Sequence, residues 1–222
     1  MGRIRKAVIF GTGSLAEVAY FYLSQDSKYK VVAFTATRDY IRAPSFLGLP
    51  LVPFESVEDM FPTKDHDMFI AIGYVHLNKS RERFYNESKA KGYSLLTYIS
   101  SKATVWSKLA GDNCFILEDN TIQPYVSIGN DVIMWSGNHI GHHSRIDDHC
   151  YITSHVVISG YCHIKPYTFI GVNSTVRDNV TVERDNIIGA GALILRNTRE
   201  GGVYGEAGTQ MSAKASSEIK TI

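Results

Sequence analysis

Histidine is the residue type in this sequence best suited to acid–base or metal chemistry, and the histidines are clustered. Six of the eight fall between residues 139 and 163. Imidazole is both a common metal ligand and a general base near neutral pH. A metal site and a proton-transfer site are therefore the two hypotheses for this stretch, and the choice depends on where the fold directs each ring.

A glycine-rich turn near the start of the chain is the second candidate site. Gly11, Gly13 and Ser14 lie in GTGSLA, which fits G-x-G-x-x-A between an apolar run at 6–10 and a helical pattern. Backbone N–H groups and the helix dipole favour phosphate at such a turn. NAD is disfavoured, because the expected second strand ends in Thr-Ala-Thr-Arg at 35–38, without the acidic residue that holds the ribose. The functional interpretation is a binding site for a nucleotide sugar. The alternative is a tight turn that binds no ligand.

The first hundred residues alternate apolar strands with helical patterns. We expect strands at 6–10, 30–36, 49–54, 67–73 and 93–99, and helices after the glycine turn, at 56–62 and at 78–92. Such alternation predicts a small parallel sheet. Loops at the carboxyl ends of parallel strands line the ligand crevice. Gly73 and Tyr74, with Asn78 and Arg81, are therefore candidate contacts for the same ligand.

Residues 111–194 repeat with a period of six, and an aliphatic residue closes all fourteen blocks. The fourth position of the block is small or slender in most blocks, and the third often holds Asn, Asp or Gly, which tolerate positive φ. A helix would repeat at about 3.6 residues and a strand at 2. A period of six instead predicts a left-handed hexapeptide β-helix, in which residues about eighteen apart stack on successive coils.

This stacking rule separates the histidines. His143, His149 and His155 are spaced by six, so they occupy successive corners and point in different directions. They cannot converge on one metal ion within a chain. A conformational role at the corners is the alternative interpretation for them. A zinc site shared between subunits, as in the zinc-dependent carbonic anhydrases of similar fold, is a further alternative.

His142 stands apart because it occupies the second, outward position of its block. Gly160 lies eighteen residues later and is therefore expected beside it on the next coil. A base next to a bare backbone N–H suits acyl transfer, since one group takes a proton and the other donates to the oxyanion. The alternative for His142 is an exposed histidine without a catalytic role. If His142 is not the base, His143 is the alternative base.

Composition bounds the remaining possibilities. The chain has 222 residues with 23 basic and 22 acidic side chains, so no strong net charge draws it to nucleic acid or membrane. The apolar run near the N-terminus is too short for the hydrophobic region of a signal sequence, and no apolar run approaches 18 residues. We therefore expect a cytoplasmic protein. Cys114, Cys150 and Cys162 all occupy the inward fourth position and are expected in the core, not as metal ligands or disulfides.

These observations predict three segments. Residues 1–102 would form an α/β nucleotide-sugar-binding domain with a small parallel sheet, and residues 103–200 a left-handed β-helix acyltransferase domain. After Ile194 the period fails, and residues 201–222 are expected to be a polar tail that covers the last coil.

An α/β domain with a glycine loop, followed by a hexapeptide solenoid, resembles the bacterial nucleotide-amino-sugar N-acetyltransferases and the related sialic acid O-acetyltransferases. The resemblance implies a homotrimer with active sites between solenoids, and acetyl-CoA as the acyl donor without a metal. It implies that His142 is the base and that the Gly160 N–H faces the thioester. It also implies CoA contacts at Tyr151, where the family commonly has histidine, and near Gly160, Gly171 and Ala190.

The resemblance further makes Gly11, Gly13 and Ser14 candidate contacts of the nucleotide sugar. The family commonly has an acidic residue beside the base, whereas this chain has Gly141 and His143 there. Asn138, or a carboxylate from a neighbouring subunit, is expected to orient His142 instead. Asn138 is also a candidate substrate contact.

We therefore expect an N-acetyltransferase that moves an acetyl group from acetyl-CoA directly to a nucleotide-linked amino sugar. O-acetylation of a sugar hydroxyl is an alternative with the same fold and base. A non-catalytic protein that binds sugar nucleotides is the alternative from another class.

Overall fold

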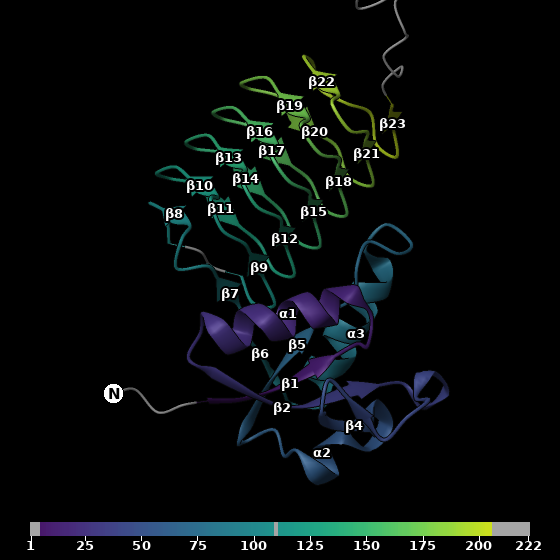
Figure 1. Ribbon diagram of the computed structural model, residues 1–222. Helices are drawn as coiled ribbons and strands as arrows, with labels where there is room; N and C mark the ends of the chain where they lie inside the picture. The colour runs from purple at the N-terminus through teal and green to yellow at the C-terminus, as the bar shows by residue number, and fades with distance from the viewer. Residues whose placement is uncertain (1–4, 109–110, 206–222) are drawn as a thin grey trace, which may run out of the picture.

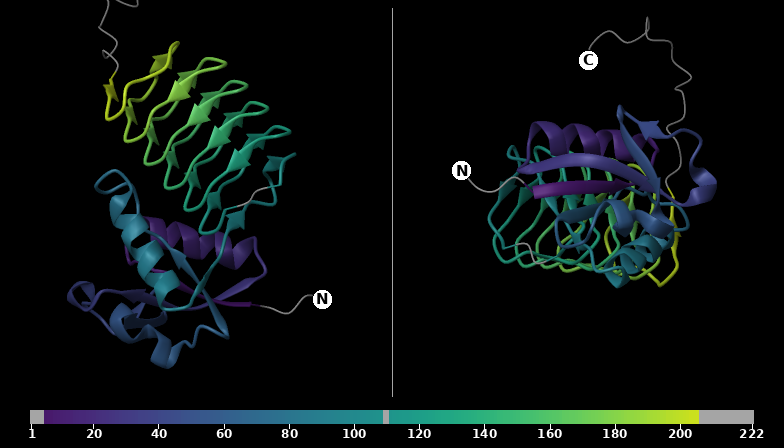
Figure 2. Two further views of the ribbon diagram at one scale, coloured as in Figure 1. Left: turned by 180° about the vertical axis from the view of Figure 1, so that it is seen from behind. Right: turned by 90° about the horizontal axis from the view of Figure 1, so that it is seen from below.

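The computed structural model describes residues 5–108 and 111–205, which form an α/β domain seated against a β-helix (Figure 1). None of the helices within those residues is long and apolar enough to cross a membrane. The coils of the β-helix advance away from the α/β domain toward the C-terminal residues (Figure 2).

The α/β domain contains one sheet with the strand order β3-β4-β2-β1-β5-β6. Its pairings are parallel except for β3, which runs antiparallel to β4. The elements are β1 (Arg5–Phe10), α1 (Ser14–Gln25), β2 (Tyr29–Ala36), the 3-10 turn η1 (Arg38–Tyr40), β3 (Ser45–Phe46), β4 (Leu49–Pro53), η2 (Phe54–Ser56), α2 (Val57–Met60), β5 (His66–Ile70), α3 (Lys79–Ala90) and β6 (Ser94–Leu95). The predicted parallel sheet is thus confirmed, with one short antiparallel strand added.

The two faces of this sheet are covered differently. Buried residues of α2 and α3 pack on one face. Buried residues of α1 pack on the other, in an apolar core that continues into the β-helix through Phe115, Ile133 and Tyr151. The helix α1 therefore lies between the sheet and the solenoid (Figure 1).

The β-helix is built from two-residue parallel strands on three sheets. Sheet 1 comprises β7 (Tyr98–Ile99), β9 (Phe115–Ile116), β12 (Ile133–Met134), β15 (Tyr151–Ile152), β18 (Phe169–Ile170), β21 (Ile187–Ile188) and β23 (Val203–Tyr204). Sheet 2 comprises β8 (Thr104–Val105), β10 (Thr121–Ile122), β13 (His139–Ile140), β16 (Val157–Ile158), β19 (Thr175–Val176) and β22 (Leu193–Ile194). Sheet 3 comprises β11 (Ser127–Ile128), β14 (Arg145–Ile146), β17 (His163–Ile164) and β20 (Thr181–Val182). The α/β domain packs on sheet 1.

The hexapeptide prediction is confirmed position by position. Strands pair with partners eighteen residues away, for example Ile122 with Ile140. Every residue that closes a block is buried in one core. All fourteen third positions have positive φ: Asn113, Asp119, Tyr125, Asp131, Gly137, His143, His149, His155, Tyr161, Tyr167, Asn173, Asn179, Asp185 and Gly191. The corner residues are therefore selected for a left-handed backbone, and this explains the Asn, Asp and Gly found there.

One predicted strand was wrong. Residues 93–99 do not form a single strand of the α/β sheet, because β6 pairs with β5 whereas Tyr98–Ile99 pairs with Phe115–Ile116 of the solenoid. The solenoid sheets therefore begin before residue 103, and the exact division between the predicted domains stays a prediction. Of the predicted tail, Val203–Tyr204 pairs with Ile187–Ile188, and residues 206–222 lie outside the described residues.

The three cysteines are buried and free, as predicted. Burial raises the pKa of the thiols of Cys114 and Cys150 to about 12, and it raises the pKa of Cys162 as well. Only the thiolate attacks a disulfide reagent, so the folded protein at pH 8 should not react with dithiodipyridine, whereas all three thiols should react in denaturant. Release of pyridinethione, measured with and without guanidinium, checks this. Rapid stoichiometric reaction of the folded protein would contradict it.

Candidate functional site

The corner between sheets 2 and 3 brings His142 and Gly160 together, as the stacking rule predicts. A β-carbon on Gly160 would lie 2.9 Å from Cε1 and 3.1 Å from Nε2 of His142, so the ring covers the glycine. His142 is exposed. Within the described part of the chain, no acceptor is hydrogen-bonded to the Gly160 N–H and no partner to His142 Nε2. The described residues thus place a ring nitrogen without a hydrogen-bond partner beside a glycine whose N–H has no acceptor.

The neighbours of His142 differ from those expected. Its backbone N–H donates to Gln123 Oε1 at 2.9 Å, and its Nδ1 lies 3.1 Å from Nδ1 of His143. Asn138 is buried and its polar atoms bond to Asn120, to the Trp135 carbonyl and to the Val156 N–H. Asn138 is therefore a structural residue inside the coil and not the orienting or substrate-binding group that we expected.

The other corner histidines are dispersed around the solenoid. His143 lies between sheets 2 and 3, His149 between sheets 3 and 1, and His155 between sheets 1 and 2. Residues 5–108 and 111–205 contain no group of three or more His, Cys, Asp or Glu side chains that could hold a metal ion. His155 also covers a glycine one coil away, Gly137, so a ring over a glycine is not specific by itself.

The glycine loop forms one side of a pocket between the α/β domain and sheet 1. Its cavity volume is about 240 Å³. The pocket is lined by Gly13, Ser14, Leu15, Val18, Ala71, Gly73, Tyr74, Trp135 and Tyr151. Gly11 shapes the loop, because its φ is +123° and a β-carbon there would lie 2.8 Å from the Ala71 carbonyl oxygen. Three predicted contacts, Gly13, Ser14 and Gly73, therefore share a cavity at the N-terminus of α1.

Tyr151 lies in this pocket and not beside Gly160. Its hydroxyl accepts a hydrogen bond from Trp135 Nε1 at 2.6 Å, and its ring packs edge-on against Tyr74. Tyr74 was expected beside Gly73 at the ligand and does line this pocket, whereas sequence reasoning missed Trp135. The signal was an outward aromatic residue on a solenoid face, but the period alone does not tell which face carries the other domain.

A second cavity of about 480 Å³ adjoins the first and shares Val18 and Trp135 with it. Burial, reinforced by a hydrogen bond to Glu118, raises the pKa of Tyr22 to about 12. Burial acts against ionisation of Glu118, but hydrogen bonds from Tyr22 and Ser136 outweigh it and lower the pKa of that carboxyl. Glu118 is therefore an anion at neutral pH on the wall of this cavity.

Asn78 and Arg81 do not line either cavity. Both side chains are fully buried. Arg81 Nε donates to Asp131 Oδ1 at 2.9 Å, and its Nη2 donates to the Asp131 carbonyl oxygen at 2.9 Å. Its Nη1 donates to Asn78 Oδ1 at 3.1 Å. These residues therefore tie α3 to the solenoid and are not the substrate contacts that we expected.

Gly171 and Ala190 adjoin each other at the corner between sheets 1 and 2. A β-carbon on Gly171 would lie 2.6 Å from the Ala190 backbone nitrogen. Sheet 2 separates this corner from the one that holds Gly160. Their role as CoA contacts remains a prediction.

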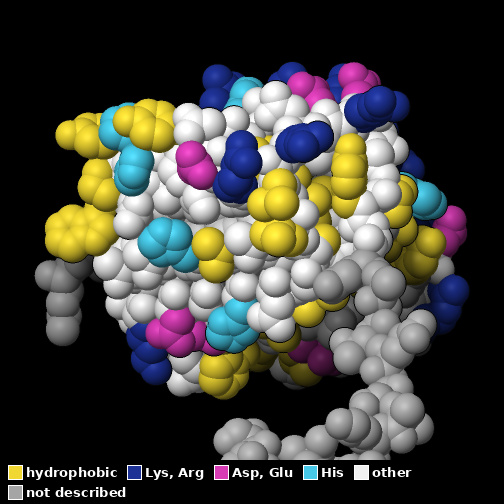
Figure 3. Space-filling model, turned by 90° about the horizontal axis from the view of Figure 1, so that it is seen from above, with side chains coloured by type: hydrophobic (Ala, Val, Ile, Leu, Met, Phe, Trp, Pro, Cys, Tyr) yellow, Lys and Arg dark blue, Asp and Glu magenta, His cyan; other side chains and the backbone are white. Residues whose placement is uncertain are grey.

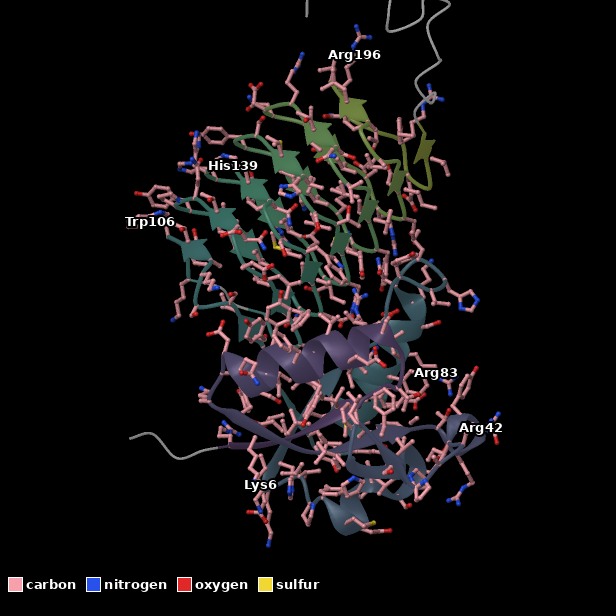
Figure 4. The ribbon with its side chains drawn as sticks, in the orientation of Figure 1. Lys6, Arg42, Arg83, Trp106, His139 and Arg196 are labelled. Atoms are coloured by element: carbon pink, nitrogen blue, oxygen red, sulfur yellow. The ribbon has the colours of Figure 1, made fainter. Side chains whose placement is uncertain are left out.

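Within one chain the pocket and the histidine lie on different sides of the solenoid. The pocket faces sheet 1, whereas His142 lies at the opposite corner, between sheets 2 and 3. Figure 4 shows Trp106 and His139, which precede this corner on sheet 2, at the edge away from the α/β domain. Figure 3 shows hydrophobic and histidine side chains gathered along one edge of the solenoid. The glycine-loop pocket and His142 of one chain therefore do not form a single site.

Comparison with known proteins agrees with this architecture. Residues 161–196 match the family model "Bacterial transferase hexapeptide (six repeats)". The chain is similar to gamma carbonic anhydrase 1, mitochondrial, of Arabidopsis thaliana, with 29% identity over 157 residues, which are 68% of this chain. The chain spans about half the length of that curated relative, since the match covers 50% of it.

Solved structures match the chain over both domains. The acetyltransferase domain of PglB from Neisseria gonorrhoeae FA1090 matches with a TM-score of 0.80 and 22% identity, covering 91% of this chain and 97% of that one. PerB from Caulobacter crescentus, solved in complex with CoA and GDP-perosamine, also has a TM-score of 0.80, with 24% identity and coverage of 92% and 95%. These matches confirm the predicted fold: an α/β domain followed by a left-handed hexapeptide β-helix.

Proposed function

We propose that the protein transfers an acetyl group from acetyl-CoA to the amine of a nucleotide-linked amino sugar. The observation that carries this proposal is the ring of His142 over Gly160, where neither Nε2 nor the glycine N–H has a hydrogen-bond partner among residues 5–108 and 111–205. The fold similarity to PerB, which was solved with CoA and GDP-perosamine, supports the substrate class.

The chemistry follows from those two groups. The neutral amine attacks the thioester carbonyl, and His142 Nε2 takes the proton that the amine loses as the C–N bond forms. The Gly160 N–H donates a hydrogen bond to the oxyanion. When the C–S bond breaks, the CoA thiolate leaves and receives that proton. No acyl-enzyme is required, because the amine itself is the nucleophile, and the three cysteines are buried.

The pocket at the glycine loop suits the nucleotide sugar. The N-terminus of α1 supplies backbone N–H groups and a favourable dipole for the diphosphate beside Gly13 and Ser14. The rings of Tyr74, Trp135 and Tyr151 supply apolar surface for the rest of the ligand.

The separation of pocket and histidine supports a homotrimer with shared sites. In a cyclic assembly the pocket of one chain can face the His142 corner of the next. Exposed apolar side chains lie at and near that corner: Trp106, Tyr125, Val157, Tyr161 and Leu193. We infer that this region contacts a second copy, with CoA running between chains past Gly160, Gly171 and Ala190.

The test is incubation of the protein with acetyl-CoA and a panel of nucleotide sugars that carry either an amine or a hydroxyl at the variable carbon. We expect thiol release and a mass gain of one acetyl group with an amino sugar, and no effect of a chelator, since His142 and Gly160 supply the base and the donor. Turnover only with hydroxyl acceptors would establish O-acetylation instead. Binding of a nucleotide sugar without thiol release from any acceptor would make the protein a non-catalytic binder.

A further inference from the structure

We propose that His143 is the positioning residue for His142: its Nδ1 accepts a hydrogen bond from His142 Nδ1–H and so keeps the free electron pair of His142 on Nε2. The inference rests on the proposed function, because it assigns the partner of the proposed base. In the described residues, no carboxylate is hydrogen-bonded to the ring of His142 or of His143. The imidazole of His143 would therefore be the hydrogen-bond acceptor for His142.

His142 and His143 contact each other through their Nδ1 atoms. The two Nδ1 atoms are 3.1 Å apart, so one of them carries the hydrogen and the other accepts it. If His143 were the donor, neutral His142 would carry its proton on Nε2, which lies 3.1 Å from the place that a β-carbon on Gly160 would occupy. The base would then have no electron pair where the acceptor amine arrives. Only the arrangement in which His142 donates leaves Nε2 free to act.

The ring of His143 is held in place by aromatic neighbours. Its ring stacks on Tyr161 with centroids 4.7 Å apart and an interplanar angle of 12°, and it lies 4.6 Å from Tyr125 on the other side. The three residues occupy the third position of successive coils, each with φ between +57° and +65°. This column fixes the direction in which His143 Nδ1 points. His142 is packed edge-on against both His143 and Tyr161.

The hydrogen bond to His143 also suits the protonated form of His142. After His142 takes the proton from the amine, both of its nitrogens carry hydrogen. The Nδ1–H continues to donate to His143, so the hydrogen bond persists through the transfer and no group must reorient. A histidine base that is fixed in its tautomer by a partner is far more effective than one in the wrong tautomer.

The chain itself offers matched substitutions for the test. Its third positions hold Tyr, Asn and Gly as well as His, all at positive φ, so each of these residues fits the backbone at position 143. His143→Tyr keeps an aromatic ring in the column but removes the Nδ1 acceptor. His143→Asn loses the ring but places Oδ1 close to the former Nδ1. His143→Gly loses both.

We expect kcat of His143→Asn to stay within about threefold of the parent protein, and kcat of His143→Tyr and His143→Gly to fall by at least about tenfold, as for a base in a mixed tautomer. KM for acetyl-CoA should change by less than about twofold in all three, since ground-state binding is untouched. Full kcat in His143→Tyr, or a larger loss in His143→Asn than in His143→Tyr, would overturn the proposal.

A spectroscopic measurement separates this inference from the proposed function. The nitrogen chemical shifts of 15N-labelled histidine report which nitrogen of His142 carries the hydrogen, whether or not any acetyl transfer occurs. We expect the Nδ1–H form in the parent protein and in His143→Asn, and a mixture in His143→Tyr. An Nε2–H form of His142 in the parent protein would refute the positioning role even if the enzyme proved active.

Discussion

Replacing His142 by alanine should lower kcat by about 100-fold or more while KM for acetyl-CoA stays nearly constant, as expected for loss of a general base. The fold should be unaffected, because the side chain is exposed and another second position, Ala190, already carries alanine. Steady-state kinetics with the nucleotide amino sugar that the panel identifies would measure the effect, and a thermal melt would verify the fold. Full activity in His142→Ala would move the base to His143.

The matched control is His155→Asn. His155 covers Gly137 across one coil as His142 covers Gly160, but it lies at another corner of the solenoid. Its φ is +58°, and Asn173 holds the same position on the next coil with φ +57°. We expect unchanged kcat in this variant. An equal loss in both variants would mean that removal of any corner histidine disturbs the solenoid.

Mixing two inactive variants tests whether the site is shared between chains. His142→Ala retains the pocket, and Ser14→Trp would fill the pocket while leaving His142 in place. In hybrid trimers about a quarter of the sites would combine an intact pocket with an intact histidine from different chains, so activity should return. If the hybrids stay inactive although mass spectrometry shows that they have formed, each site must lie within one chain.

Removing the guanidinium in Arg81→Ala should lower the free energy of unfolding by about 3–5 kcal/mol, because it leaves a buried carboxylate without its cation. Arg81 and Asp131 are both fully buried, and Arg81 also donates to the Asp131 and Cys150 carbonyls. His149 Nδ1, 2.8 Å from the other oxygen of Asp131, would then be the nearest basic group to that carboxylate. Urea unfolding followed by circular dichroism and by tryptophan fluorescence would measure the loss.

Arg83→Ala is the control on the same helix. Arg83 is exposed and pairs with Glu87 one turn along α3, an interaction worth about 0.3–0.5 kcal/mol. A loss in Arg81→Ala no larger than in Arg83→Ala would show that the interdomain ion pair does not stabilise the protein.

The solenoid could be predicted from the sequence because its rules are local. A period of six requires a left-handed corner and an inward small residue in each block, and both are visible in residue types such as Asn113 and Cys114. The same period places Gly160 beside His142, since stacking on successive coils depends only on the spacing along the chain. Fold, buried thiols and the His142–Gly160 pair were therefore all predictable.

The contacts between the two domains could not be predicted in this way. Arg81 was expected at the ligand, because loops at the carboxyl ends of parallel strands line the ligand crevice, but it pairs with Asp131 across the domain interface. Asn138 was expected to orient His142 or to contact the substrate, but it bonds within the coil. Both outcomes depend on which groups meet in space, and no spacing along the chain reports that.

The sequence by itself thus determined the coil, its corners and the pairing of His142 with Gly160, because these follow from short-range backbone geometry repeated every six residues. Only the tertiary structure decided that sheet 1 carries the α/β domain, that Tyr151 belongs to the pocket, and that this pocket lies away from His142 of the same chain. The physical reason is that domain docking is selected by side-chain complementarity between segments far apart in sequence, such as Arg81 and Asp131, and not by any periodic pattern.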